Sequence, residues 1–294
     1  VILVAAAFFF IDFGSGIGSF EPRIADIPVE FQPVANYIQG CLEQVATDGV
    51  IRLGQQGGYI DPIGIGLQAG FEDTDGEIVE MPPGSGKYVA YWYYLESDND
   101  CRGNCRFASG RPALFRDDGE FSIEGQLDTY INENLEVCLA DFEGIIGEGF
   151  SIEPQGPVET KTTVTKEDIV FVVEYPLLVT AIGTREIDEF AIRLPIKLLD
   201  MYEQATILSN LEIDQRYIEK AMLNTLVPYT GVQEGELPPM THASFNFGSN
   251  KQWRRTEVSQ QVKNIIAIYV QALQVFDARN FEEVSVLGDR IKET

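Results

Sequence analysis

The stretch Glu186-Ile-Asp-Glu-Phe-Ala-Ile-Arg-Leu-Pro-Ile196 decides the fold class, because its apolar residues recur at every second position. Phe190, Ile192 and Leu194 alternate with more polar or smaller neighbours, as expected of an antiparallel strand with one buried face. The same period predicts three earlier strands, at 150–153, 158–165 and 169–180. Short polar turns join the four segments, so an antiparallel meander is the most economical arrangement.

Helical periodicity predicts helices that cover this sheet. Two of them, at 31–53 and 122–144, have continuous apolar stripes, and Pro33 and Ser122 suit their first turns. Two more are predicted at 197–225, with a break near 211–214, and at 255–277. A further strand is predicted at 88–95, and Asp75-Gly76 is a hairpin signal. The predicted fold class is therefore α+β, with an N-terminal hydrophobic helix ahead of an ectodomain in which helices pack on an antiparallel β-meander.

The chain begins with an apolar segment, Val1-Ile-Leu-Val-Ala-Ala-Ala-Phe-Phe-Phe-Ile11, that has to be buried in something. At about 1.5 Å per residue, such a helix would reach only about half of a ~30 Å hydrocarbon core. We interpret it as the end of a longer membrane or filament-core helix, and because residue 1 is not Met we expect residues before it. A helix packed in its own globular domain and a remnant of a secretory signal are the alternatives.

This segment suggests how the chain is organised. Its predicted assembly residues are Val1, Ile2, Leu3, Val4, Phe8, Phe9, Phe10 and Ile11. Three glycines behind it form a predicted hinge, at Gly14, Gly16 and Gly18. We expect three parts: the hydrophobic helix and hinge (1–19), a helix-rich, disulfide-stapled region (20–148), and an antiparallel sheet with covering C-terminal helices (149–294).

Four cysteines predict a disulfide framework. Cys101-Arg-Gly-Asn-Cys105 lies in a polar, turn-rich stretch where a tight loop can close. Cys41 and Cys138 lie on the apolar stripes of two predicted helices and could crosslink them. Four cysteines allow three connectivities, of which we favour 41–138 with 101–105. Zinc binding and free buried thiols are the alternatives, whereas disulfides would place the ectodomain outside the cytoplasm.

The composition excludes some partners. The formal net charge is −25 over 294 residues, which argues against nucleic acid, because phosphate binding needs a basic surface. The same charge disfavours docking on anionic lipid head groups. An acidic, well-solvated outer surface is the expected result.

No pattern of residues predicts an enzyme, a cofactor or a metal site. His242 is the sole histidine, and its surroundings match no nucleophile motif. Pro83-Gly-Ser-Gly-Lys87 looks like the end of a phosphate loop, but an aromatic strand follows where a helix is needed, so we interpret it as a turn. The acidic run at 72–77 has the oxygens of a calcium loop without its twelve-residue spacing. Tyr91-Trp-Tyr-Tyr94 could stack on sugars, although core or subunit interface is the simpler interpretation.

Four stretches of the chain resemble an uncharacterised family of archaeal cell-envelope proteins. They are Tyr37-Ile-Gln-Gly-Cys-Leu-Glu-Gln-Val45, Leu53-Gly-Gln-Gln-Gly-Gly-Tyr-Ile-Asp-Pro62, Tyr91-Trp-Tyr-Tyr94 and Tyr130-Ile-Asn-Glu-Asn-Leu-Glu-Val-Cys-Leu139. The family is similar to type IV pilins at its N terminus, where a short leader runs into one hydrophobic helix ahead of a large ectodomain. The resemblance extends to about residue 210 and implies surface display, with assembly into a filament or tube. This chain differs from pilins in its larger ectodomain and in showing no glutamate near the helix start within the given sequence, and the family supplies no catalytic residues.

Two functions from different classes follow. The first is an extracellular structural subunit that forms a homopolymer through its N-terminal helix, with membrane contact through that helix before or instead of assembly. The second is a membrane-anchored binding module or adhesin, which would use the aromatic strand or the loop-rich insertion at 228–251 for recognition. An envelope hydrolase is a third and weaker hypothesis, because no constellation of catalytic residues supports it.

Overall fold

The computed structural model describes residues 27–70, 76–97, 101, 103–118, 121–147, 149–231, 235–240 and 252–272. These residues form two compact units, each made from two separate parts of the chain. We call residues 27–61 and 111–204 the sheet unit, and residues 62–110 and 205–272 the hairpin unit. The boundary predicted at residue 149 falls inside the sheet unit, because helix α2 (Ile123–Leu139) packs against strand β6 (Glu159–Val164).

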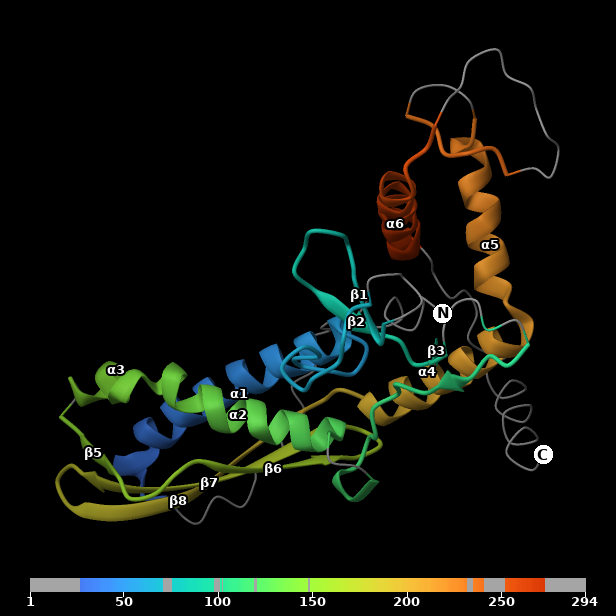
Figure 1. The fold of residues 1–294 in the computed structure, drawn as a ribbon. Coiled ribbons are helices and arrows are strands. Elements are labelled where there is room, and N and C mark those ends of the chain that lie inside the picture. Colours follow the sequence, from blue (N-terminus) through green and yellow to red (C-terminus); the bar gives the residue numbers. More distant parts are fainter. Residues whose placement is uncertain are drawn as a thin grey trace. The chain divides into compact units, whose positions relative to one another are not determined.

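The fold is a mixture of α-helices and antiparallel sheets, as the sequence predicts (Figure 1). In the sheet unit, helices α1 and α2 lie side by side over the sheet, with α1 spanning Gln32–Gln55. The predicted N-terminal hydrophobic helix and its glycine hinge lie outside the described residues.

Helix α1 follows a 3₁₀ turn at Val29–Phe31 and has Pro33 in its first turn. Proline is well tolerated there, since the missing N–H would have no partner within the helix. The helix ends at Gln55, and the next glycines, Gly57 and Gly58, have φ angles of 73° and 91°. Apolar residues three and four positions apart form its buried stripe, which includes Val34, Ile38, Leu42, Val45 and Leu53.

Helix α2 begins at a side-chain cap. Ser122 Oγ accepts a hydrogen bond from the N–H of Gly125 at 3.1 Å, as the sequence predicts for this serine. The Gln126 side chain then fixes the loop that leaves α1: its Oε1 accepts the N–H of Ile60 at 3.0 Å, and its Nε2 donates to Gly58 O at 3.2 Å. The start of α2 and the end of α1 are therefore held together by polar contacts.

The end of α2 differs from the sequence prediction, which continued this helix to residue 144. The helix stops at Leu139, because residues 140–142 take left-handed backbone angles, and α3 (Glu143–Ile146) follows. Phe142 at this bend is buried, and its ring stacks with that of Tyr175 at 6.4 Å between centroids. Burial of this aromatic contact compensates the unfavourable backbone angles.

Strand β7 (Ile169–Thr180) is the centre of the main sheet. Strand β8 (Thr184–Leu194) pairs along one edge of β7, while β6 and β5 (Ser151–Pro154) follow one another along the other edge. All of these pairs are antiparallel. The predicted meander is therefore correct for β6, β7 and β8 but wrong for β5, which pairs with β7 instead of β6.

A local interruption explains the position of β5. The ladder between β7 and β8 shifts register between Glu174 and Leu177, where Pro176 has no N–H to donate. Opposite this bulge, the N–H of Gln155 donates to Pro176 O at 2.8 Å, which keeps the chain between β5 and β6 alongside β7. Gly156 is needed here, since a Cβ would come within 2.9 Å of the Pro176 ring.

The core of the sheet unit lies on one face of β7. Its side chains alternate between buried and half-buried or exposed positions, as expected for a sheet covered by helices on one side. The buried series is Ile169, Phe171, Val173, Tyr175, Leu177 and Val179.

The hairpin unit contains two small antiparallel ladders. Strand β1 (Ile78–Glu80) pairs with β2 (Tyr88–Ala90), and β3 (Tyr94–Leu95) pairs with β4 (Phe107–Ala108). The single strand predicted at 88–95 is thus wrong, because residues 91–93 separate two strands of different ladders. The observed hairpin turns at 81–87, which contains the predicted turn Pro83–Lys87, and Asp75 lies outside the described residues.

Helices form most of the described chain after residue 197. Helix α4 (Leu198–Gln215) runs from the sheet unit into the hairpin unit, and α5 (Tyr217–Leu226) follows a break at Arg216, where φ is 49°. Helix α6 (Arg255–Ala272) confirms the start of the last predicted helix. A small core joins α5 and α6 through Leu226, Leu237 and Ile265.

Candidate functional site

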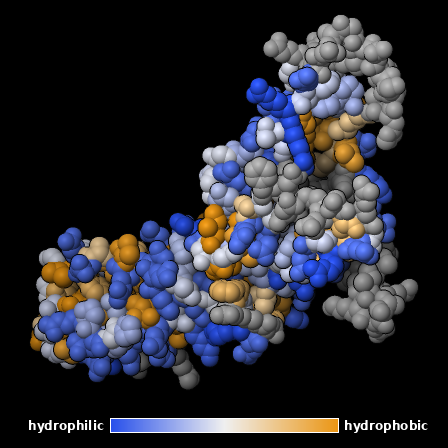
Figure 2. All heavy atoms as spheres, in the orientation of Figure 1, coloured by the Kyte–Doolittle hydropathy of each residue, from blue (hydrophilic) through white to orange (hydrophobic). Residues whose placement is uncertain are grey.

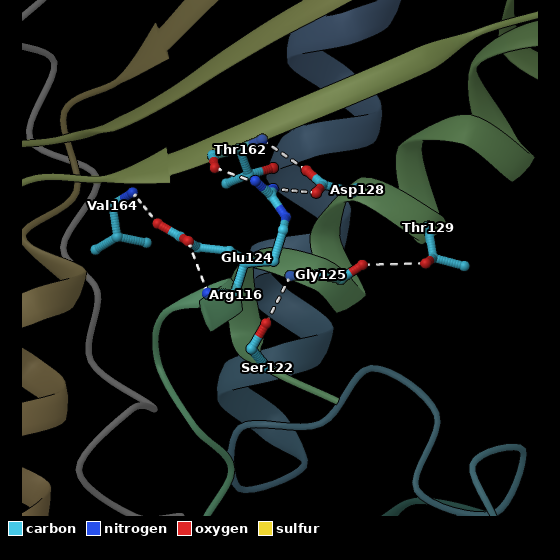
Figure 3. Close-up of polar contacts among 8 residues, drawn as sticks. All are labelled: Arg116, Ser122, Glu124, Gly125, Asp128, Thr129, Thr162 and Val164. Atoms are coloured by element: carbon cyan, nitrogen blue, oxygen red, sulfur yellow. Dashed lines mark hydrogen bonds and ion pairs between the residues drawn. The ribbon is translucent and has the colours of Figure 1, made fainter. Parts of the chain in front are cut away.

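A cluster of polar contacts in the sheet unit lies between helix α2 and the outer edge of strand β6 (Figure 3). Glu124 Oε1 accepts the N–H of Val164 at 2.9 Å, and Asp128 Oδ1 accepts the N–H of Thr162 at 2.6 Å. Four helical residues rise about 6 Å and two strand residues about 6.8 Å, so carboxylates four apart on a helix match alternate N–H groups of a strand. We call these contacts the carboxylate ladder.

Arg116 closes the ladder from the loop before α2. Its backbone N–H donates to Glu124 Oε2 at 3.0 Å. Its guanidinium forms an ion pair with Asp128 Oδ2 and donates to Thr162 O at 3.3 Å. All four carboxylate oxygens of Glu124 and Asp128 therefore have partners within the protein (Figure 3).

Burial sets the electrostatics of this cluster. Glu124 is 7% exposed, and burial raises the pKa of the Asp128 carboxyl against the lowering effect of Thr162 hydrogen bonds and the Arg116 guanidinium. A carboxyl whose pKa is raised by burial could suggest acid–base catalysis. Here the same oxygens accept backbone N–H groups that would otherwise be unpaired at a sheet edge, so the arrangement is that of a structural contact.

Sequence reasoning missed the carboxylate ladder. Glu124 and Asp128 are polar residues beside the apolar stripe of α2, and such residues usually indicate a solvated helix face. The available signal was their spacing of four residues combined with Thr162, which sits in a predicted strand. This spacing identifies the contacts of Glu124 and Asp128 only when it is known that α2 packs along β6.

The disulfides have the pairing that the sequence favours. Cys41 on α1 is bonded to Cys138 on α2, with 5.7 Å between the Cα atoms, and Cys101 is bonded to Cys105, with 5.0 Å. The first crosslinks two antiparallel helices of the sheet unit, and the second closes a loop in the hairpin unit. Two disulfides indicate an oxidising, non-cytoplasmic compartment.

The predicted assembly and hinge residues cannot be placed. The segment Val1–Ile11 and the glycines Gly14, Gly16 and Gly18 lie outside the described residues, as does the sole histidine, His242. Among the residues that are described, no group of three or more His, Cys, Asp or Glu side chains could hold a metal ion. The described helices include none that is both long and apolar enough to cross a membrane.

Comparisons of the chain with protein-family models, with characterised proteins and with solved structures found no match.

Proposed function

We propose that this chain is a structural subunit of an extracellular filament or tube, assembled through its N-terminal hydrophobic segment. The observation that carries the proposal is the Cys41–Cys138 crosslink in α1, the first described α-helix after that segment in the sequence. Cys41 lies in the first half of α1, the first described helix after residues 1–26, so tension applied through those residues reaches α1 first.

The crosslink distributes such a load. Cys138 lies in the last turn of α2, and the Tyr37 hydroxyl donates to Leu139 O at 3.2 Å beside it. From α2, the carboxylate ladder connects the load to β6 and hence to the central strand β7. A helix held only by apolar packing could slide out under force, whereas a covalent bond between α1 and α2 resists this.

Surface chemistry supports display in water. The net charge of −25 keeps ectodomains soluble and separate, so assembly would depend on the apolar segment. Figure 2 shows a largely hydrophilic surface over the sheet unit on the face in view, with scattered apolar residues. The N-terminal segment is the longest uninterrupted apolar run of this acidic sequence. Burying each of its phenylalanine rings would contribute about 2–3 kcal/mol to the free energy of assembly.

The experiment compares two triple variants of the full chain by electron microscopy of detergent-free material. In one, Phe8, Phe9 and Phe10 are replaced by Ser, which we expect to abolish ordered filaments or tubes. In the matched control, Ala5, Ala6 and Ala7 are replaced by Ser; this adds the same hydroxyl groups but removes far less apolar surface. Assembly should survive in the control at a higher critical concentration.

Three outcomes would contradict the proposal. They are an unmodified chain that forms only dispersed particles after detergent extraction, a phenylalanine variant that assembles normally, and equal loss of assembly in both variants. The first of these would favour an anchored ectodomain with a binding role.

A further inference from the structure

A pair of stacked aromatic rings stands at the surface of the hairpin unit. The rings of Tyr93 and Phe107 are nearly parallel, at 7°, with 5.0 Å between their centroids. Phe107 is 52% exposed, whereas the neighbouring Tyr91 and Trp92 are buried at 7% and 4%. Within the aromatic run at 91–94, Tyr91 and Trp92 therefore belong to a core. Tyr93 is half-buried and stacks with the exposed Phe107 of the facing strand β4.

The backbone beneath these rings is held by many contacts. Leu95 pairs with Phe107 in the ladder, and the N–H of Glu96 donates to Arg106 O at 2.9 Å. Beyond them, the Cys101–Cys105 disulfide closes the loop, and the Asn104 N–H donates to Cys101 O at 3.0 Å.

The base of the hairpin is equally constrained. The Ser109 hydroxyl donates to Trp92 O at 3.1 Å, and the Tyr94 hydroxyl donates to Glu77 Oε1 at 3.2 Å. Gly110 lies so close to Tyr91 O that any side chain there would clash. These contacts fix the backbone that carries the ring pair, and a fixed backbone lowers the entropy cost of binding a ligand.

We propose that Tyr93 and Phe107 form a stacking platform for a neutral pyranose glycan, independently of how the chain assembles. A sugar ring has a flat face of C–H groups that packs on an aromatic ring, with hydroxyls at its rim. A solvent-exposed aromatic ring held in a fixed orientation suits such a ligand, and the disulfides indicate a compartment where glycans occur. The net charge of −25 disfavours anionic sugars.

The test uses the full chain immobilised on a sensor surface, with soluble oligosaccharides as analytes. The probes are cellohexaose, chitohexaose and mannohexaose as neutral pyranoses, and hexagalacturonate as an anionic one. We expect saturable binding of at least one neutral probe and none of the anionic one. Phe107→Ala should weaken that binding about tenfold or more, and Phe107→Tyr should preserve it because the flat ring remains.

Phe107→Leu separates stacking from folding, since leucine retains an apolar side chain but lacks a flat face. It should bind as weakly as the alanine variant while both disulfides, checked by mass spectrometry, stay intact. Phe115→Ala is the matched control, because Phe115 is another exposed phenylalanine, at 41%, in the sheet unit. The proposal is overturned if no neutral probe binds the unmodified chain, if Phe107→Leu binds normally, or if Phe115→Ala loses binding equally. Phe107-dependent binding of phosphatidylcholine vesicles without sugar binding would also overturn it.

Discussion

Gly49 on α1 lies directly against the ring of Tyr130 on α2: a Cβ at Gly49 would come within 2.9 Å of Tyr130 Cδ1. The ring cannot easily move aside, because the Tyr130 hydroxyl donates to Asp48 and the Arg52 guanidinium lies 5.4 Å from the ring centroid. The close approach of α1 and α2 at this level therefore depends on the absence of a side chain at position 49.

Two glycine-to-alanine changes in α1 should have opposite effects on the free energy of unfolding. Gly49→Ala should lower it by about 1–3 kcal/mol, since the added methyl group is forced into the Tyr130 ring. Gly40, in the same helix, is exposed, and apart from the backbone of its own helix no described atom lies within 4 Å of the position of a Cβ. Gly40→Ala should therefore raise stability by about 0.5–1 kcal/mol through helix propensity alone. Urea unfolding of both variants measures the two changes in the free energy of unfolding, and changes of the same sign would contradict the prediction.

The two disulfides should differ in their contribution to stability. Cys41 and Cys138 are 97 residues apart, so their bond restricts the unfolded chain much more than the bond between Cys101 and Cys105, which are 4 apart. Replacing the first pair by Ser should lower the free energy of unfolding by about 3–5 kcal/mol, and replacing the second pair should lower it by about 2 kcal/mol or less. Thermal unfolding of the two double variants compares them. A larger loss for the short loop would show that local strain, not chain entropy, decides the ranking.

Much of the fold could be predicted from local sequence patterns. The period of two placed β6, β7 and β8 to within two residues at every bound, and helix stripes with Pro33 and Ser122 placed the starts of α1 and α2. Errors arose where contacts distant in sequence override the local pattern. Pro176 and Gln155 align β5 with β7, and the stacking of Phe142 on Tyr175 accompanies the bend after α2. A periodicity argument contains no information on either contact.

The candidate sites were less predictable for the same reason. The carboxylate ladder needs the register of α2 on β6, and the aromatic platform needs Phe107 to face Tyr93 from a strand twelve residues away from β3. The cysteine pairs could be predicted because two helical stripes and one short loop leave few sensible connectivities. A side chain whose role depends on a tertiary contact cannot be identified from the sequence until the contacting residue is known.

The carboxylate ladder should be essential to the stability of the sheet unit. Asp128→Ala removes the acceptor of the Thr162 N–H and leaves Arg116 without its ion-pair partner, so we expect a loss of about 2–4 kcal/mol. Glu133→Ala is the matched control, since Glu133 is an exposed acid on the same helix, and its effect should stay within about 0.5 kcal/mol. Amide hydrogen exchange gives a local readout: the Thr162 N–H should exchange faster in the Asp128 variant. Unchanged exchange would mean that this hydrogen bond does not protect the strand edge.

Three glutamates lie side by side across the exposed face of the sheet. Glu159 on β6 is paired with Glu174 on β7, which is paired with Glu189 on β8, and all three are exposed. Like charges directly opposite one another destabilise a sheet, so Glu174→Gln should raise stability by about 0.2–1 kcal/mol at low ionic strength. The gain should shrink in concentrated salt, which screens exposed charges. Glu153→Gln is the control, because Glu153 is paired with Leu178. Equal gains in stability from both variants would mean that the lower net charge, and not the repulsion among the three paired glutamates, is the cause.

Alkaline pH should destabilise the protein through two tyrosines. Burial, followed by hydrogen bonding to Asp48, raises the pKa of Tyr130 to about 12, and burial with the nearby Glu136 raises the pKa of Tyr175 to about 12. In the unfolded chain these hydroxyls ionise near pH 10. Their contribution is therefore complete below pH 10 and is lost as the pH rises from 10 to 12, because only the unfolded state releases the proton there. The melting temperature should fall across this window in the unmodified protein, and less steeply in Tyr130→Phe and Tyr175→Phe. The double variant should be flattest, since the two residues lie in different contacts; a double variant with the original slope would rule out both tyrosines as the cause.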